Sequence, residues 1–430
     1  MALARGLLVA SSLIAGAQAL TVAEAAAIAG TYAANIKVTR NPVYPLDLVD
    51  QYELETRSKV EAYLTKKVQA GTNNNCTLAN AGVRQEWADL SIEEREEYVA
   101  AVTCLMKLPA QAPKDRFPGA VSRFDDFVAY HMTHAMELHN NYNLFPAHKH
   151  FIWAFEQALR NECGYKGYQP YMNYDRIAKD LTTNPANSPH WNGNSSSLGG
   201  NGEPDPEHKG IGQGNRIIIP SGGGGGCVKS GPFSDMVVSL GPTSMTSIKH
   251  LPKNPKADGT GSNPRCLRRD INKDAALGAT ADRAHKLLVE SKNVDTFYNG
   301  LLGSPPVRDD PHGFGIHTAG HYIHAVDPGG DAGTSPGDPG FYFHHGALDR
   351  LWWMWQMQDP EERLNAVPMY GKVIPMDHGS HGMKEKRQAR ETDPNKMVVD
   401  LKWLSPLVSP LMQAHDQLGS NGGAYCYIYI

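Results

Sequence analysis

Cysteine is scarce in this chain of 430 residues, and none of its six cysteines forms a C-x-x-C pair. The spacing usual for a structural zinc site or a dithiol redox site is therefore missing. An excess of either charge is missing too, because 41 lysines and arginines are balanced by 45 aspartates and glutamates. Without a polybasic region, nucleic acid is not an expected partner. No internal repeat of fixed period is present.

Long apolar runs are also absent, except for a short one at the N-terminus. There, basic Arg5 precedes an apolar stretch over Gly6–Ala15 and the small residues Ala17-Gln18-Ala19. This order is typical of a secretory signal peptide cut after Ala19, and it is too short for a membrane span. We therefore predict that residues 1–19 are a signal peptide, that the protein is secreted, and that it has no membrane partner.

The composition that remains is that of an ordinary globular protein, with 41% apolar and 20% charged residues. An even number of cysteines in an oxidising compartment predicts disulfides, although fifteen pairings are open. Asn75-Cys76-Thr77 and Asn194-Ser195-Ser196 are candidate glycan acceptors. The sequence thus predicts a secreted glycoprotein with disulfide bonds.

Helical periodicity dominates the pattern of apolar residues. The stretch 91–107 opens with Ser91 followed by Glu94, which is the spacing of a capping box. A region rich in Gly, Pro, Ser and Asn, residues 185–265, is predicted to be loop, and the end of the chain is β-prone. Helices are predicted over residues 47–70, 91–107, 122–139, 149–162, 274–291, 315–324 and 347–358.

Histidine is the informative residue type. Nine of the eighteen histidines fall in two windows, 131–150 and 312–324, and the pair His344-His345 follows soon after. His317 and His321 have i, i+4 spacing and therefore project from one face of a helix. Zinc proteases use the same spacing but need a glutamate beside the first histidine, where this chain has Thr318.

The first window can supply a second set of imidazole ligands, and helical spacing leaves both His131 and His134 as candidates. Two separate histidine clusters, each able to give three ligands, suggest two metal ions facing each other. Because imidazole suits several metals, ligand type alone does not name the ion. A histidine-only pair of sites without bridging carboxylates favours copper over iron or manganese.

The stretch from Asp338 to Asp349 narrows this interpretation. It reads D-P-G-F-Y-F-H-H-G-A-L-D, and it resembles the second-copper signature of the type 3 copper proteins: tyrosinases, catechol oxidases and haemocyanins. The chain is most similar to secreted short-form fungal catechol oxidases and tyrosinases. The likeness extends over roughly residues 115–430.

The resemblance implies six copper ligands. His345, rather than His344, matches the last ligand of the second copper. The first-copper pattern fits two further histidines followed by Phe155-Glu156, and the spacing of the short fungal forms selects His131 over His134. The implied cofactor is a pair of copper ions held by His131, His139, His148, His317, His321 and His345.

The family's fold is also implied by the resemblance. We expect a mainly α tyrosinase-like core, with a four-helix bundle holding two coppers, long loops and a few short strands. An N-terminal helical segment, residues 20–114, should pack on a catalytic domain, residues 115–430, and no C-terminal shielding domain is expected. Tyr427-Ile428-Tyr429 resembles the tyrosine motif that closes the family's core, and it is expected to meet an arginine near Arg123.

The activity implied is oxidation of o-diphenols to o-quinones with reduction of O₂ to water. Small phenols and O₂ are then the partners, and no oligomeric state is predicted. The alternatives are a tyrosinase with full monophenolase activity and an o-aminophenol oxidase. A haemocyanin-type oxygen carrier is disfavoured, because carriers are generally large assemblies and this chain has no repeated units.

Selectivity should depend on residues beside the ligands. Tyrosinases that hydroxylate monophenols often carry asparagine after the first ligand of the second copper, with a glutamate nearby. Here Thr318 takes that position, the acids upstream are Asp309 and Asp310, and Tyr322 would narrow the entrance. The expectation is catechol oxidation with weak or absent monophenol hydroxylation.

Other positions are expected around the ligands rather than among them. Asp349 should orient an imidazole or pair with Arg350, while Phe341 and Glu156 should lie close to the coppers. The stretch QPYMNYDR replaces the family's P-Y-W-D-W and should alter the surroundings of the first copper. His150 and His324 are expected as surface or supporting imidazoles, and ordinary surface histidines are predicted at residues 190, 208, 250, 285, 378, 381 and 415.

Overall fold

The computed structural model describes residues 40–71, 76–139, 143–213, 216–244, 250–303, 310–368, 397–419 and 423–430. Helices dominate this part of the chain, so the prediction of a mainly α fold is confirmed. The α-helices are α2 (Leu48–Gln69), α3 (Ile92–Lys107), α4 (Arg123–Leu138), α5 (Leu144–Cys163), α6 (Tyr174–Thr183), α7 (Lys273–Ala276), α8 (Ala281–Glu290), α9 (Val294–Leu302), α10 (Ile316–Tyr322), α11 (Gly340–Gln356), α12 (Pro360–Arg363) and α13 (Leu411–Ala414).

The strands are short and form two-stranded ribbons. The first and the last of them pair in parallel, β1 (Gly82–Arg84) with β10 (Tyr427–Tyr429). The antiparallel pairs are β2 (Gly202–Pro204) with β5 (Gly225–Val228), β3 (Gly210–Gln213) with β4 (Arg216–Pro220), β6 (Val237–Val238) with β7 (Arg265–Cys266), and β8 (Val398–Asp400) with β9 (Val408–Pro410). Three of these ribbons lie in the region predicted to be loop.

Local sequence sets where several helices begin. In α3 the hydroxyl of Ser91 accepts from the backbone N–H of Glu94, whose carboxylate accepts from the N–H of Ser91, as predicted. Ser122 and Asp125 form the same capping box at the start of α4. These reciprocal bonds satisfy N–H groups that have no partner within the helix.

Two helices start earlier than predicted, and both carry histidines. α5 begins at Leu144 rather than residue 149, with Pro146 in its first turn, where a missing N–H costs no hydrogen bond. α11 begins at Gly340 rather than residue 347, with the carboxylate of Asp338 accepting from the Gly340 N–H at 2.8 Å. Every residue of α11 is buried, so it lacks the polar face on which periodicity arguments depend.

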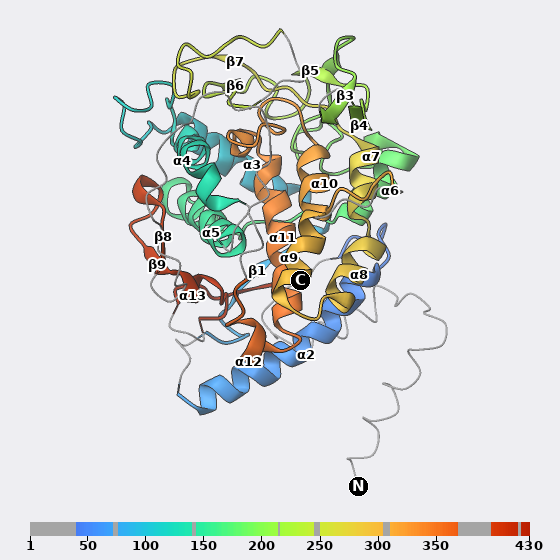
Figure 1. The fold of residues 1–430 in the computed structure, drawn as a ribbon, viewed down its shortest axis with the longest axis vertical. Coiled ribbons are helices and arrows are strands. Elements are labelled where there is room, and N and C mark those ends of the chain that lie inside the picture. Colours follow the sequence, from blue (N-terminus) through green and yellow to red (C-terminus); the bar gives the residue numbers. More distant parts are fainter. Residues whose placement is uncertain are drawn as a thin grey trace.

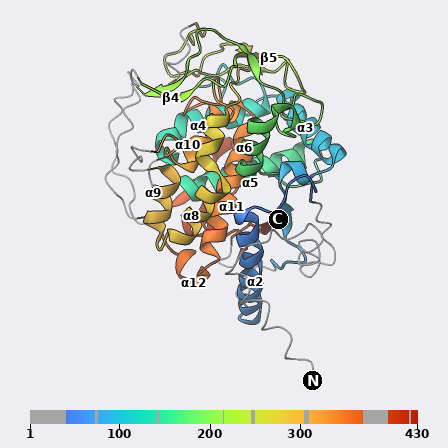
Figure 2. The ribbon, with the colours of Figure 1, turned by 90° about the vertical axis from the view of Figure 1, so that its right-hand side faces the viewer.

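The helices arrange around a central group formed by α4, α5, α10 and α11 (Figure 1). α5 packs against both α4 and α11, and α11 packs against α10. On the outside, α3 covers α4 and α5, while α2 packs along α8 and α11. The β3–β4 and β2–β5 ribbons gather at the end of the molecule opposite α2 (Figure 2).

One hydrophobic core extends from Val49 in α2 to the end of the chain at Ile430. Its largest side chains include Trp352, Trp353 and Trp355, which are all buried on α11. The division at residue 114 into an N-terminal segment and a catalytic domain stays a prediction.

All six cysteines are paired, which confirms the predicted disulfides. The pairs are Cys76–Cys426, Cys104–Cys163 and Cys227–Cys266. No helix among the described residues has the length and apolar character to cross a membrane. The predicted signal peptide and Asn75 lie outside the described residues, and Asn194 is exposed.

Candidate dinuclear metal centre

Three histidines converge between α4 and α5. His131 projects from α4, His139 follows its last residue, and His148 projects from the first turns of α5. One ring nitrogen from each lies within 4.8 Å of the others. His134, the other sequence candidate, instead stacks on the ring of Tyr130 at 4.2 Å between centroids.

Backbone carbonyls orient these three rings. In each ring Nδ1 lies within hydrogen-bonding distance of a carbonyl oxygen, so that Nδ1–H is the donor and the Nε2 lone pair is left for a metal. The acceptors for His131, His139 and His148 are the carbonyls of Gly333 at 2.7 Å, Ala135 at 2.8 Å and Leu144 at 2.8 Å.

A second group forms between α10 and α11. His317 and His321 project from one face of α10, and His344 and His345 from the facing turn of α11. One nitrogen from each of the four lies within 4.8 Å of the rest. The Nε2 atoms of His321 and His345 are 3.3 Å apart, so both point at the same small space.

The two groups adjoin. The rings of His148 and His345 stack with their centroids 4.3 Å apart, and those of His139 and His317 lie 6.0 Å apart. Phe341 lies against both groups, with its ring centroid 4.2 Å from that of His345 and 5.4 Å from that of His131. A pair of metal ions bound here would share one compact site.

Electrostatics keep the imidazoles neutral. Burial, followed by the neighbouring imidazoles, lowers the pKa of both His131 and His317 to about 3. The same causes hold the pKa of His345 well below its ordinary value. Neutral imidazole is the form that binds a transition metal.

The donor atoms fit a bound metal. The Nε2 atoms of His131, His148 and His317 are buried and have no hydrogen-bond partner among the described residues. A buried polar atom without a partner costs free energy, which a metal–nitrogen bond would recover. Two clusters built from imidazole alone suit copper.

The partners predicted for Asp349 differ from those that the structure shows. Asp349 neither touches an imidazole nor pairs with Arg350. Its carboxylate accepts from Lys149 at 2.8 Å and from the hydroxyls of Tyr427 and Tyr429 at 2.7 and 2.6 Å. It lies one turn beyond His345, at the level of the β1–β10 pair instead of the metal site.

Arg84 completes this buried cluster, and sequence reasoning missed it. Its Nε donates to Glu156 at 2.9 Å, its guanidinium lies 3.4 Å from Asp349, and it stacks 3.7 Å from the centre of the Tyr427 ring. Arg84, rather than Arg123, is thus the arginine of the tyrosine motif. Arg123 is bound to Glu162 and to other partners.

The sequence did not predict the role of Arg84, because β1 has only three residues and its partner strand β10 lies at the far end of the chain. Arg350 also has other partners than predicted, since it donates to Glu53 at 2.9 Å and to Asp50 at 2.9 Å. Both acids lie on α2. Long-range ion pairs of this kind leave no local spacing to recognise.

Several other predictions about histidines need correction. His190, His208 and His415 are buried, not on the surface, and Nε2 of His208 lies 2.8 Å from Asp270. For His150 and His324, expected as surface or supporting imidazoles, burial excludes only the surface alternative, and His150 lies between Leu407 and Tyr425. His324 is buried against Trp191. His378 and His381 lie outside the described residues, whereas His250 is partly exposed.

Thr318 and Tyr322 follow His317 and His321 directly on α10, and both are half-buried. Tyr322 packs against the hydrophobic core, and burial raises its pKa. The stretch QPYMNYDR was expected near the first copper site. It instead contacts the second group of histidines, where the Tyr174 hydroxyl lies 2.8 Å from Nδ1 of His344.

The comparison with protein families agrees with this geometry. Residues 121–358 match the model described as the common central domain of tyrosinase. The chain belongs to the tyrosinase family. The family's cofactor is a dinuclear type 3 copper site, and its members are oxidoreductases.

Fungal proteins are among the relatives. The tyrosinase-like protein orsC of Emericella nidulans is 37% identical over 76% of this chain and 85% of its own length. The N-acetyl-6-hydroxytryptophan oxidase ivoB of the same organism is 35% identical over 69% and 82%. A polyphenol oxidase variant from Thermothelomyces thermophila has the same fold, with a TM-score of 0.73, 31% identity, and coverage of 89% and 97%.

Proposed function

We propose that this tyrosinase-family protein is a secreted catechol oxidase with weak or absent monophenol hydroxylation. The observation that carries the proposal is the meeting of two all-histidine groups, in each of which one ring nitrogen per histidine lies within 4.8 Å of the others. His131, His139 and His148 would hold one copper ion, and His317, His321 and His345 the other. Two bound copper ions supply the chemistry that transfers electrons from o-diphenols to O₂, yielding o-quinones and water.

The chain's own part is to fix geometry and exclude water. The carbonyls of Gly333, Ala135 and Leu144 orient the first three rings through Nδ1, which directs Nε2 toward a metal. Phe341 closes the apolar side of the site against His131 and His345. Burial of this kind keeps the imidazoles neutral, which is the form that binds copper.

Selectivity for diphenols is supported by the residues at the start of α10. A diphenol oxidase needs no base to deprotonate a monophenol, so the state of the acids upstream of α10 bears on selectivity. Of the two acids upstream, Asp309 lies outside the described residues. Both carboxylate oxygens of Asp310 accept from Arg283, at 2.7 and 2.8 Å. Hydrogen bonds from Arg283 lower the pKa of Asp310 to about 2, which makes it a poor base.

Oxygen uptake by protein of measured copper content tests the function directly. A catechol and its matching monophenol are supplied in parallel. We expect rapid uptake with the catechol alone. Uptake with both, after a lag on the monophenol, would make the protein a full tyrosinase. Two bound coppers with neither phenol consumed would favour an o-aminophenol oxidase or, less readily, an oxygen carrier.

Thr318→Asn is expected to raise monophenol activity relative to diphenol activity. An asparagine amide beside His317 can order a water molecule that accepts the phenol proton, which threonine does not do as well. The measurement is the ratio of the two initial rates at equal copper content. Thr318→Ser is the matched control and should leave the ratio unchanged. An unchanged or lower ratio in Thr318→Asn would remove position 318 as a determinant of selectivity.

Secretion is supported by the N-terminal pattern and by three disulfides, since disulfides persist in oxidising compartments. N-terminal sequencing of protein recovered from the culture medium checks this. Leu20 is expected as the first residue, and a protein retained in the cells with Met1 intact would contradict it.

A further inference from the structure

Tyr174 links two helices that the metal site does not otherwise join. It is the first residue of α6, and its hydroxyl reaches His344 on α11. The hydroxyl oxygen lies 2.8 Å from Nδ1 and 3.1 Å from the backbone oxygen of the same histidine. Both side chains are buried.

The hydroxyl satisfies both groups at once. It donates its hydrogen to the His344 carbonyl, and its oxygen accepts from Nδ1–H. In the opposite arrangement the two oxygens would face each other at 3.1 Å without a hydrogen. The Nε2 atom of His344 has no hydrogen-bond partner in the described part of the chain. Tyr174, together with the backbone carbonyl of His317, which also hydrogen-bonds to this histidine, therefore fixes the rotation of the ring.

The His344 ring fills the space between α10 and α11. Its centroid lies 4.4 Å from that of His321 and 4.9 Å from that of His345. On the α10 side the ring meets Gly320, where a Cβ atom would come within 2.0 Å of Nδ1. His344 thus acts as a spacer, because α10 can approach it only at a residue without a side chain.

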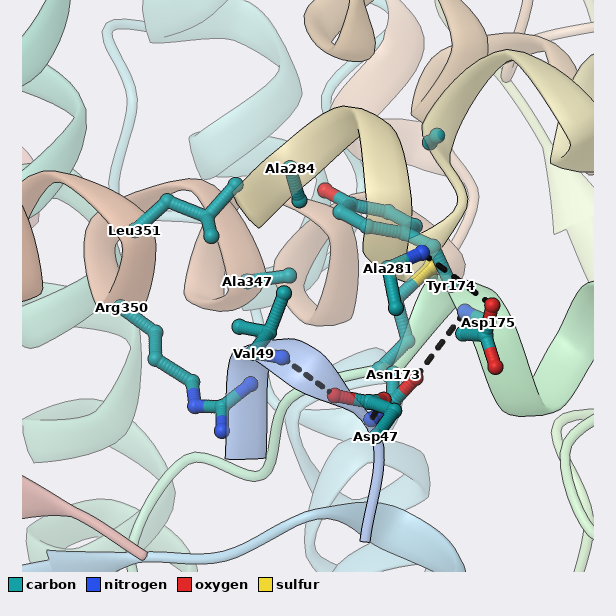
Figure 3. A pocket seen from close by; sticks show the side chains of 12 residues that line it. Asp47, Val49, Asn173, Tyr174, Asp175, Ala281, Ala284, Ala347, Arg350 and Leu351 are labelled. Carbon is teal, nitrogen blue, oxygen red and sulfur yellow. Dashed lines mark hydrogen bonds between the residues drawn. The ribbon is translucent and has the colours of Figure 1, made fainter. Parts of the chain in front are cut away.

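Tyr174 is itself held firmly at the start of α6. The neighbouring Asn173 donates from its side chain to Asp47 at 2.7 Å and from its backbone to Glu86 at 3.1 Å. Figure 3 shows Asn173 between Asp47 and Asp175, with Tyr174 on the wall of a small cavity. The Tyr174 side chain lines this cavity, as does Ala347 on α11. Because the cavity leaves open space on that side of Tyr174, its hydroxyl bonds to His344 help to fix its position.

We propose that Tyr174 is a positioning residue of the second copper site, acting through His344. Its hydroxyl fixes the orientation of the His344 ring between α10 and α11. The ring in turn sets the distance of His317 and His321 on α10 from His345 on α11. The inference rests on the proposed function, because it assigns those three histidines to one copper ion. In this proposal His344 supports the second copper site but is not itself a copper ligand.

Tyr174→Phe removes only the hydroxyl and is expected to weaken copper binding at the second site about 10-fold, the lower end of the effect usual for groups that orient ligands. The first site should be unaffected, since its rings are oriented by backbone carbonyls. If Tyr174 had a merely structural role, its replacement would lower the stability of the whole protein and would affect the copper affinity of both sites equally.

Single-site proteins make the comparison direct. In a His148→Ala background the second site remains, and in a His345→Ala background the first remains. Copper(I) affinity is measured in each by anaerobic competition with a colorimetric chelator, using ascorbate as reductant, with and without Tyr174→Phe. The expected result is a loss of affinity in the His148→Ala background alone.

Tyr44→Phe is the matched control. The Tyr44 hydroxyl is also buried and also bonds α6, where it donates to Asp180 at 2.8 Å. Its removal should lower the thermal midpoint of the copper-free protein without changing copper affinity in either background. Equal losses at both sites in Tyr174→Phe, or a change below about twofold, would overturn the inference.

Gly320→Ala tests the same spacer from the other side, because the added Cβ must displace the His344 ring. It is expected to produce the same selective loss, and unchanged second-site affinity would overturn the inference. A protein that binds no copper in either background would refute the proposed function as well. Two intact copper sites with an unchanged second-site affinity in Tyr174→Phe refute the inference alone.

Discussion

Replacement of His345 by alanine is expected to remove one of the two copper ions and essentially all oxidase activity. The Nε2 atom of His345 lies 3.3 Å from that of His321 and points into the second group of histidines. Its ring also stacks on His148 at 4.3 Å, at the junction of the two groups. Losing this ring removes a ligand and opens the junction at the same time.

Copper content and oxygen uptake with a catechol are the measurements. One copper per chain and a rate at background are expected for His345→Ala, with the same outcome for His148→Ala. His250→Ala is the control, since His250 is partly exposed and outside both groups, and it should keep both coppers. Near-normal turnover in His345→Ala would show that the ligand assignment is wrong.

His344→Ala separates the two neighbouring histidines. With copper in excess, this variant should still hold two ions, because His344 spaces the helices and does not bind the metal. Its affinity for the second ion should fall, as for Tyr174→Phe. Loss of a full equivalent in excess copper would identify His344 as the ligand in place of His345.

Asp349→Ala is expected to lower the free energy of unfolding by about 3–5 kcal/mol, the cost of leaving buried charges without their partner. Lys149 and Arg84 are both fully buried and both pair with this carboxylate. Lys149, followed by Arg84, offsets the effect of burial and holds the pKa of Asp349 below its ordinary value. Alanine would leave two cations facing each other in the core.

Urea unfolding of the copper-free protein at pH 7 measures this cost. Glu361→Ala is the control, because Glu361 pairs with Lys66 at 2.8 Å while both side chains are more than half exposed. Exposed pairs of this kind are worth less than about 1 kcal/mol. A loss in Asp349→Ala no larger than in the control would show that the buried cluster does not stabilise the fold.

The sequence predicted which histidines come together better than it predicted what surrounds them. His317 and His321 could be recognised because four-residue spacing on a helix is local information. The choice of His345 over His344 came from the resemblance, and no helical periodicity could have made it. His131 and His134 illustrate the same limit, since the two differ only in whether the ring faces α5 or stacks on Tyr130.

Contacts between distant parts of the chain were the features that could not be predicted. Arg84 reaches Asp349 and Tyr429 only because β1 pairs with β10. Arg350 binds acids on α2 that lie at the other end of the sequence. Asp349 was placed correctly on its helix but assigned the wrong partners, because one helical turn separates the metal site from the ion cluster.

The disulfide between Cys76 and Cys426 spans a separation of 350 residues and so closes the chain into one large covalent ring. Every histidine of both groups belongs to that ring. A protease that cuts the backbone once, anywhere between these cysteines, would leave two pieces still tied together. Such nicked enzyme would migrate as a single band on a denaturing gel until a thiol reductant is added.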